Sequence, residues 1–156
     1  MKNKKKIKIE LTPNERKRLR TNKIKHSEVS GYLVDDLSLL LDVPFERARE
    51  IHALAEFQTV PSVGIKFAND LIRLGYFSLG ELSLKEGHEL IDEMEQSAGI
   101  WMDPCVEDQC RLIVHFAINR DLSKKWWSFT EDRKKYRTEF GYPAGRPKKG
   151  WFEVRK

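Results

Sequence analysis

The stretch that most restricts the fold is residues 60–68, Val-Pro-Ser-Val-Gly-Ile-Lys-Phe-Ala, which has the character of a tight turn leading directly into a helix. Pro61 fixes one φ angle, and Gly64 has no Cβ to obstruct an approaching group. Apolar side chains continue at helical spacing after the turn, which predicts a helix from 65 to about 74 with one buried face. The apolar residues of that face are Val63, Phe67, Ala68, Leu71 and Ile72.

A helix that begins at a glycine turn leaves its first backbone N–H groups without partners inside the helix. These groups carry the positive end of the helix dipole, so a phosphate is a suitable ligand for them. We therefore expect a phosphate-binding turn that uses backbone amides and one lysine charge and that ignores base sequence. Its predicted residues are Ser62, Val63, Gly64, Ile65 and Lys66. The alternative is a turn that joins two helices and binds nothing.

The rest of the chain carries helix start and stop signals and no strand alternation, so the predicted fold class is all-α. Thr12 and Glu15 form a capping box around Pro13 and start a short basic helix. A second capping box, Ser83 with Glu86, predicts a helix that runs to about residue 97. The other expected helices are two within 27–57 (the second opened by Pro44), one at 78–82, one started by Asp103 and Pro104 and running to about 119, and one from Ser128 to 140.

Residues 40–54 and 60–74 correspond in type at an offset of 20 positions. The first copy has Asp42-Val43-Pro44 where the second has Ser62-Val63-Gly64, so it keeps the packing residue and loses the glycine. We interpret the two copies as halves of a tandem unit that cover each other's apolar faces. Chance similarity between two amphipathic helices is the alternative.

The net charge of +5 is unevenly distributed along the chain. Residues 1–26 carry +9, residues 27–110 carry −12 and residues 111–156 carry +8, so long-range attraction to nucleic acid is expected from the two ends. We divide the chain into a basic arm and short helix (1–26), a helical core (27–120), and a charged helix with a basic tail (121–156). Within these parts, 1–10 is expected to be a mobile arm and 142–156 an extended tail. The predicted DNA-binding residues of the last part are Lys134, Lys135 and Arg137.

Several residue types suggest chemistry that their spacing does not support. Cys105 and Cys110 lie five positions apart, about 140° around one helix, so they cannot share a zinc ion or form a disulfide. We expect inert thiols, although a helix N-terminus can lower the pKa of Cys105. Acidic side chains in the first turn of that helix suit its dipole better than a metal site. They are Asp103, Glu107 and Asp108. The pair Trp126 and Trp127, beside two lysines, either stacks on bases or covers the core.

The turn resembles the helix-hairpin-helix element, whose pattern is apolar-Pro-Gly-apolar-Gly followed by a basic residue and then alanine. Gly64, Lys66 and Ala68 match this pattern, and Ser62 replaces its first glycine. Over roughly residues 10–150 the chain is similar to the small bacterial family labelled "pathogenicity locus", some members of which carry a mitomycin-resistance label. The similarity rests on five segments, 54–58 (Leu-Ala-Glu-Phe-Gln), the turn, 75–79 (Gly-Tyr-Phe-Ser-Leu), 101–109 (Trp-Met-Asp-Pro-Cys-Val-Glu-Asp-Gln) and 125–127 (Lys-Trp-Trp).

The resemblance implies a tandem helix-hairpin-helix core, a SAM-like bundle similar to the C-terminal domain of RuvA. It implies DNA binding through this motif and a monovalent cation on the carbonyls of Gln58, Val60 and Val63. Our own hypothesis is an accessory protein of repair, recombination or DNA uptake that binds DNA without sequence specificity. We expect a cytoplasmic protein with no membrane span, because the longest apolar cluster is far too short to cross a bilayer. We expect neither enzymatic activity nor a cofactor. The alternative function is a protein-interaction module in which the turn is only structural. A metal-dependent nuclease is a third hypothesis.

Overall fold

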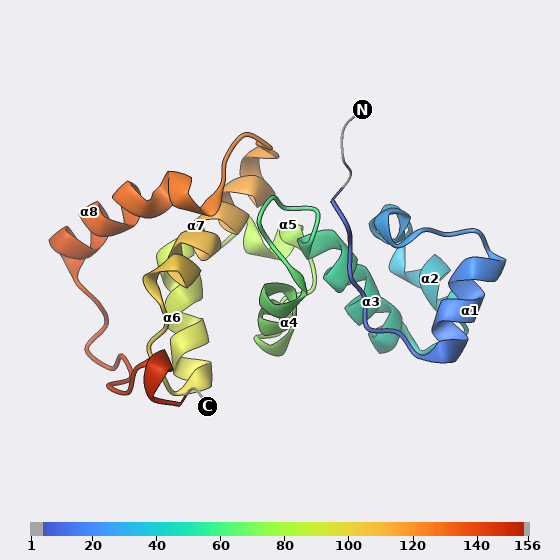
Figure 1. The fold of residues 1–156 in the computed structure, drawn as a ribbon, viewed down its shortest axis with the longest axis horizontal. Helices are drawn as coiled ribbons and strands as arrows, with labels where there is room; N and C mark the ends of the chain where they lie inside the picture. The colour runs from blue at the N-terminus through green and yellow to red at the C-terminus, as the bar shows by residue number, and fades with distance from the viewer. Residues whose placement is uncertain (1–4, 155–156) are drawn as a thin grey trace. The chain divides into compact units, whose positions relative to one another are not determined.

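The computed structural model describes residues 5–154, and all regular secondary structure in this range is helical (Figure 1). The predicted all-α class is confirmed for these residues. The chain divides into two compact units, Met1–Ser78 and Leu79–Lys156. The boundary between them differs from the predicted bounds at 26 and 120. None of the helices within 5–154 is long and apolar enough to cross a membrane.

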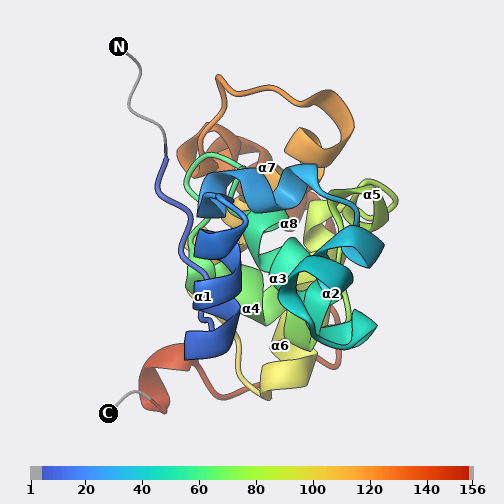
Figure 2. The same cartoon turned by 90° about the vertical axis from the view of Figure 1, so that its right-hand side faces the viewer.

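The first unit contains α1 (Pro13–Thr21), the 3-10 helix η1 (His26–Gly31), α2 (Val34–Leu41), α3 (Phe45–Phe57) and α4 (Ile65–Arg73). Helix α3 is central, since η1, α2 and α4 all pack against it (Figure 2). Helix α1 begins with the predicted capping box, in which Thr12 and Glu15 each accept the other's backbone N–H. The core is made of fully buried side chains, among them Leu37, Leu41, Ile51, Phe57 and Leu71.

Residues 5–10 pack along this unit and do not form the mobile arm expected from their lysines. Ile7 and Ile9 are buried. Between them, the N–H of Lys8 donates to Oε1 of Gln58 at 3.0 Å, and the Lys8 carbonyl accepts from Nε2 of Gln58 at 2.6 Å. The expectation is wrong for residues 5–10 because two buried isoleucines and a buried amide outweigh the cost of ordering solvated lysines. Residues 1–4 lie outside the described range.

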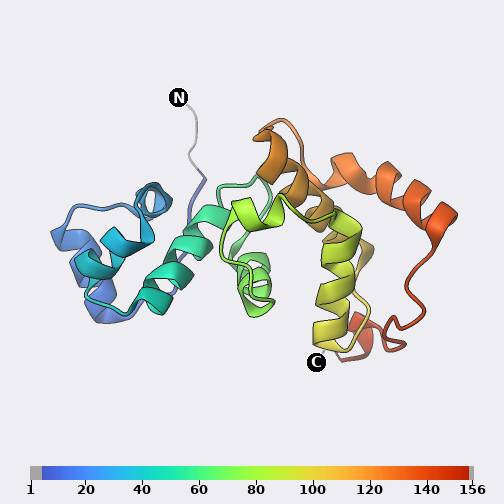
Figure 3. The ribbon, with the colours of Figure 1, turned by 180° about the vertical axis from the view of Figure 1, so that it is seen from behind.

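The second unit contains α5 (Leu79–Leu82), α6 (Gly87–Ala98), α7 (Pro104–Asn119), η2 (Trp126–Phe129), α8 (Thr130–Phe140) and η3 (Trp151–Glu153). Helices α6 and α7 pack closely against each other at its centre (Figure 3). Gly87 makes this approach feasible, because a Cβ there would lie 2.5 Å from Cγ and 2.7 Å from Cα of Arg111. The start of α7 is as predicted, with Asp103 as N-cap and Pro104 as the first helical residue.

Two other helix starts differ from the prediction. Helix α6 begins after Glu86, which forms its own capping box, and not after Ser83. The hydroxyl of Ser83 instead donates to the Gly80 carbonyl at 2.6 Å and closes the preceding short helix. Helix α8 begins at Thr130, because Ser128 belongs to η2. Both errors come from a serine that satisfies a backbone group of the preceding element.

Residues 142–154 return to the end of α6, so the expectation of an extended tail is wrong for this range. The N–H of Trp101 donates to the Lys149 carbonyl, and the N–H of Trp151 donates to the Trp101 carbonyl, both at 2.8 Å. The side chain of Gln96, near the end of α6, donates to the Gly145 carbonyl at 2.6 Å. Residues 155 and 156 lie outside the described range.

Candidate nucleic-acid interface

The turn between α3 and α4 has its glycine-like backbone at Ser62 and not at Gly64. Ser62 has a φ of 71°, in the left-handed region that favours glycine. Gly64 has φ −105° and ψ −175°, which is extended backbone that any residue adopts. The turn is closed by a hydrogen bond of 3.2 Å from the Val63 N–H to the Val60 carbonyl. The serine that replaces the first glycine of the pattern therefore holds the strained conformation itself.

The first amides of α4 are unpaired within the described residues. Gly64 is the N-cap and provides no side chain, and the N–H groups of Gly64, Ile65 and Lys66 have no hydrogen-bond partner among residues 5–154. Gly64 and Lys66 are exposed, and a Cβ built on Gly64 would meet nothing within 4 Å. The first turn of α4 contains no acidic residue. The predicted turn residues are thus brought together with donors that remain available to an anion.

The carbonyl side of the same turn already holds a positive charge. The ammonium of Lys5 donates to the Val60 carbonyl at 2.6 Å and also to the Val63 carbonyl. These are two of the three carbonyls expected to hold a monovalent cation. The third residue, Gln58, has a fully buried side chain that donates to the Leu54 carbonyl at 3.0 Å and fixes the arm at Lys8. Sequence reasoning missed Lys5.

The turn between α2 and α3 has the same backbone signature at the offset of the internal repeat. Asp42 has a φ of 54°, as Ser62 has 71°, 20 positions later. Each left-handed residue is followed by a valine, an extended N-cap (Pro44 or Gly64) and then a helix. The first turn has no amide at its N-cap, because Pro44 lacks an N–H, and it carries a carboxylate. It therefore lacks the open anion site of the second turn.

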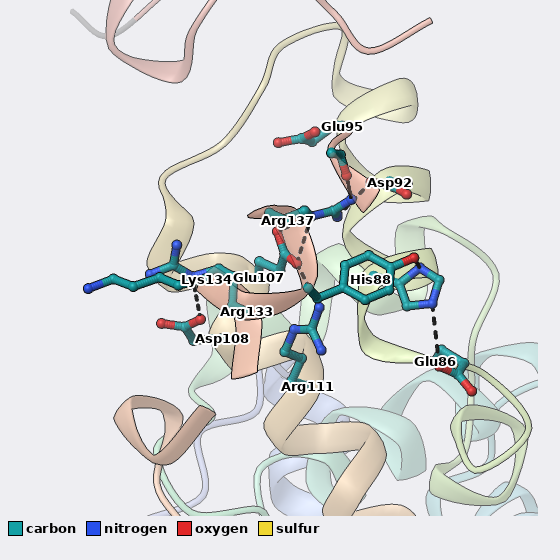
Figure 4. Close-up of polar contacts among 12 residues, drawn as sticks. Glu86, His88, Asp92, Glu95, Glu107, Asp108, Arg111, Arg133, Lys134 and Arg137 are labelled. Atoms are coloured by element: carbon teal, nitrogen blue, oxygen red, sulfur yellow. Dashed lines mark hydrogen bonds and ion pairs between the residues drawn. The ribbon is translucent and has the colours of Figure 1, made fainter. Parts of the chain in front are cut away.

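The basic residues predicted on α8 divide into two groups, of which Figure 4 labels Lys134 and Arg137. Lys134 and Lys135 are exposed. The Arg137 side chain is only 7% exposed and its guanidinium lies between two helices, 3.1 Å from Glu107 of α7 and 3.1 Å from Asp92 of α6. We therefore leave Arg137 out of the candidate interface, whose charge on α8 comes from the two lysines.

Arginines from α8 and the C-terminal segment neutralise the buried carboxylates of this unit. Asp108 is fully buried, and it accepts from Arg133 at 2.6 Å and from the hydroxyl of Thr130 at 2.9 Å. Partial burial raises the pKa of Asp92, although its ion pair with Arg137 acts in the opposite direction. The acidic first turn of α7 is thus part of the packing between α7 and α8 (Figure 4).

The thiols of α7 differ in exposure, and neither is in a disulfide: Cys105 is exposed and Cys110 is buried. Partial desolvation raises the pKa of the Cys105 thiol, and a hydrogen bond with Asp103 raises it further. Among the described residues there is no group of three or more His, Cys, Asp or Glu side chains that could hold a metal ion. Trp126 is half-buried, whereas Trp127 is 58% exposed.

A family model described as "Pathogenicity locus" matches residues 50–135, more than half of the chain. The chain belongs to the Pathogenicity locus family. No curated protein and no solved structure that we compared with the chain matched it.

The part shared with the Pathogenicity locus family begins within α3 and ends within α8. It contains the turn with Ser62 and Gly64, together with the buried Asp108 and its partner Arg133. Lys5 lies outside the matched range, as does the segment that returns to the end of α6. The family match therefore says nothing about the interactions of these two outer segments.

Proposed function

We propose that the protein binds DNA through its phosphate backbone and does not read base sequence. The turn before α4 is the helix-hairpin-helix element of this proposal, and the repeated turn at Asp42 is its degenerate partner in a tandem core. The observation that carries the proposal is the open row of N–H donors from Gly64 to Lys66, with an exposed lysine beside them. Donors of this kind at a helix N-terminus suit a phosphate oxygen.

Most of the affinity would come from exposed lysines and arginines, through release of counterions from DNA. Exposed cations occur in both units, at Arg16, Lys17 and Arg20 of α1 and at Lys134 and Lys135 of α8. The negative charge of the middle of the chain would oppose binding less than its net charge suggests. Three of its carboxylates, Glu95, Glu107 and Asp108, are buried in pairs with arginines.

The direct test is the DNA affinity of the full-length protein as a function of salt, with duplex, single-stranded and branched substrates of equal length. The proposal requires unrelated duplex sequences to bind equally and the logarithm of the affinity to fall linearly with the logarithm of the salt concentration. A preference for branched DNA would favour a role in repair or recombination. Absence of binding at micromolar protein in about 50 mM salt, where non-specific binders associate readily, would reject the proposal.

A protein-interaction module is the second candidate function. Large apolar side chains are exposed at the end of α7 and beyond it, namely Ile118, Leu122 and Trp127. Exposed Trp and neighbouring apolar residues are typical anchors of protein interfaces. In this case the turn before α4 would only join two helices. The salt titration separates the two functions, because a module of this kind would not shift duplex DNA.

A further inference from the structure

The inner side of the turn before α4 contains two carbonyls that meet one ammonium. Val60 and Val63 are fully buried, and buried carbonyls need hydrogen-bond partners. The Val60 carbonyl accepts from the Val63 N–H and from Lys5. The Val63 carbonyl accepts from Lys5 and takes part in no backbone hydrogen bond among residues 5–154. Lys5 therefore satisfies a carbonyl that the helix itself leaves open.

We infer that the Lys5 ammonium is a built-in cation that takes the place of a dissolved monovalent ion at these two oxygens. Backbone carbonyls that converge on one point bind potassium and similar ions by replacing their hydration shell. An ammonium satisfies the same oxygens with the same single charge, and it belongs to the chain. The turn thereby keeps its geometry whichever monovalent ion is in solution. This inference does not rest on DNA binding.

The segment that carries Lys5 is fixed tightly enough to deliver the ammonium. Burial of Ile7 and Ile9 holds the segment against the unit, and the two hydrogen bonds between Lys8 and the Gln58 side chain set its register. Gln58 is itself fixed by the Leu54 carbonyl one turn earlier in α3. Because the backbone is already ordered three residues away, placing the ammonium costs little additional entropy.

The same ammonium affects the outer side of the turn, and this step alone rests on the proposed function. The carbonyl of Val63 and the N–H of Gly64 belong to one planar peptide unit and point in opposite directions. A positive charge on the carbonyl polarises that unit and strengthens the N–H as a donor. Lys5 is thus a positioning residue for the donor that faces the proposed phosphate.

The test compares Lys5→Met with wild type and with Lys6→Met, at equal ionic strength in potassium chloride and in choline chloride. Methionine keeps an apolar stem and removes the charge. Lys6 is exposed and is a matched control in the same arm. Unfolding is followed by helical circular dichroism, and no DNA is present. All four tryptophans lie in 79–156, so tryptophan fluorescence reports the other unit in the same samples.

Wild type and Lys6→Met are expected to have the same melting temperature in both salts. Lys5→Met is expected to melt roughly 3–8 °C lower in choline chloride, because a buried carbonyl loses its partner, and to recover in potassium chloride. No fall in choline would overturn the inference, since the carbonyls would then need no cation. A fall that potassium chloride does not reverse would also overturn it, because the ammonium would not be acting as a small cation.

Discussion

Arg146 and Glu95 form a two-point ion pair within the unit of residues 79–156. Nε of Arg146 lies 2.8 Å from Oε1 of Glu95, and Nη2 lies 3.0 Å from Oε2. The carboxylate also accepts from the Met102 N–H at 2.7 Å, and the guanidinium lies 3.7 Å from the ring centroid of Tyr142. Glu95 is buried. The C-terminal segment is therefore attached to α6 through a charge that cannot be left unpaired without cost.

Replacing Arg146 with glutamine should destabilise this unit strongly. Removing one partner of a buried ion pair costs about 3–5 kcal/mol, because the other charge remains in a place with little water. We expect Arg146→Gln near the lower end, since the Met102 N–H still donates to Glu95. Urea unfolding followed by tryptophan fluorescence measures the loss. Lys148→Gln, at an exposed position of the same segment, is the control. Equal stability of the two variants would contradict the pairing.

Ser62→Gly should stabilise the first unit by about 0.5–1 kcal/mol. A left-handed backbone costs a residue with a Cβ roughly 1–2 kcal/mol, and the greater freedom of glycine in the unfolded chain offsets part of the gain. The same change at the exposed Ser97, within α6, should instead destabilise by up to about 1 kcal/mol, because that position is helical. Unfolding curves monitored by circular dichroism decide the sign. A loss of stability at both positions would show that the Ser62 hydroxyl matters more than its backbone.

Gly64→Ala should separate folding from DNA binding. The extended φ of Gly64 suits alanine, and the added methyl group meets nothing within 4 Å. Alanine reduces the freedom of the unfolded chain but is a poorer N-cap than glycine, so the two effects oppose each other and the free energy of unfolding should change by no more than about 1 kcal/mol. The methyl group would nevertheless lie where a phosphate approaches the amides. Loss of one charge-assisted hydrogen bond should weaken binding about tenfold or more, as measured by fluorescence anisotropy. Unchanged affinity would mean that the turn does not touch DNA.

Lysines and arginine on α8 should behave differently when neutralised. The double variant Lys134→Gln and Lys135→Gln should fold normally and lower the slope of log affinity against log salt by about 0.9 for each phosphate that is no longer neutralised. Arg137→Gln should cost about 3 kcal/mol of stability, because it leaves Glu107 buried without that guanidinium. Salt titrations and urea unfolding of both variants make the comparison. If the double variant also unfolds early, its lysines are structural.

The first unit should lose stability in acid through Glu15. Its hydrogen bonds with Arg47 hold the pKa of this carboxyl below its ordinary value of 4.5. The stability it provides is therefore complete well above pH 4.5 and is lost as the pH falls through the lower pKa of the folded state. Glu15→Gln should shrink the stability difference between about pH 6 and about pH 3.5, measured by urea unfolding with circular dichroism. Glu46→Gln, at an exposed position of α3, is the matched control.

Features that depend on neighbouring residues, such as helix caps and turns, can be predicted from the sequence. Thr12 with Glu15, and Asp103 with Pro104, start helices as predicted, because caps depend on residues only a few positions apart. The turn before α4 also lies where the sequence predicts it, since Gly64 precedes a run of clear helical periodicity.

Ion pairs between residues far apart in the chain cannot be predicted from the sequence. Arg146 meets Glu95 from 51 positions away, and no local pattern distinguishes it from its exposed neighbours Lys148 and Lys149. The docking of residues 5–10 did leave a signal, because the alternation of Ile7, Lys8 and Ile9 is typical of an extended segment with one buried face. The lysines around it obscured that alternation.

The absence of a side chain at Gly87 allows helices α6 and α7 of the second unit to lie close together. The guanidinium of Arg137 reaches Asp92 on α6 and Glu107 on α7. A methyl group at position 87 would collide with Arg111 and push the two helices apart. The Arg137 guanidinium could then no longer reach both carboxylates. The ion pairs of Arg137 therefore depend on the absence of a Cβ at Gly87.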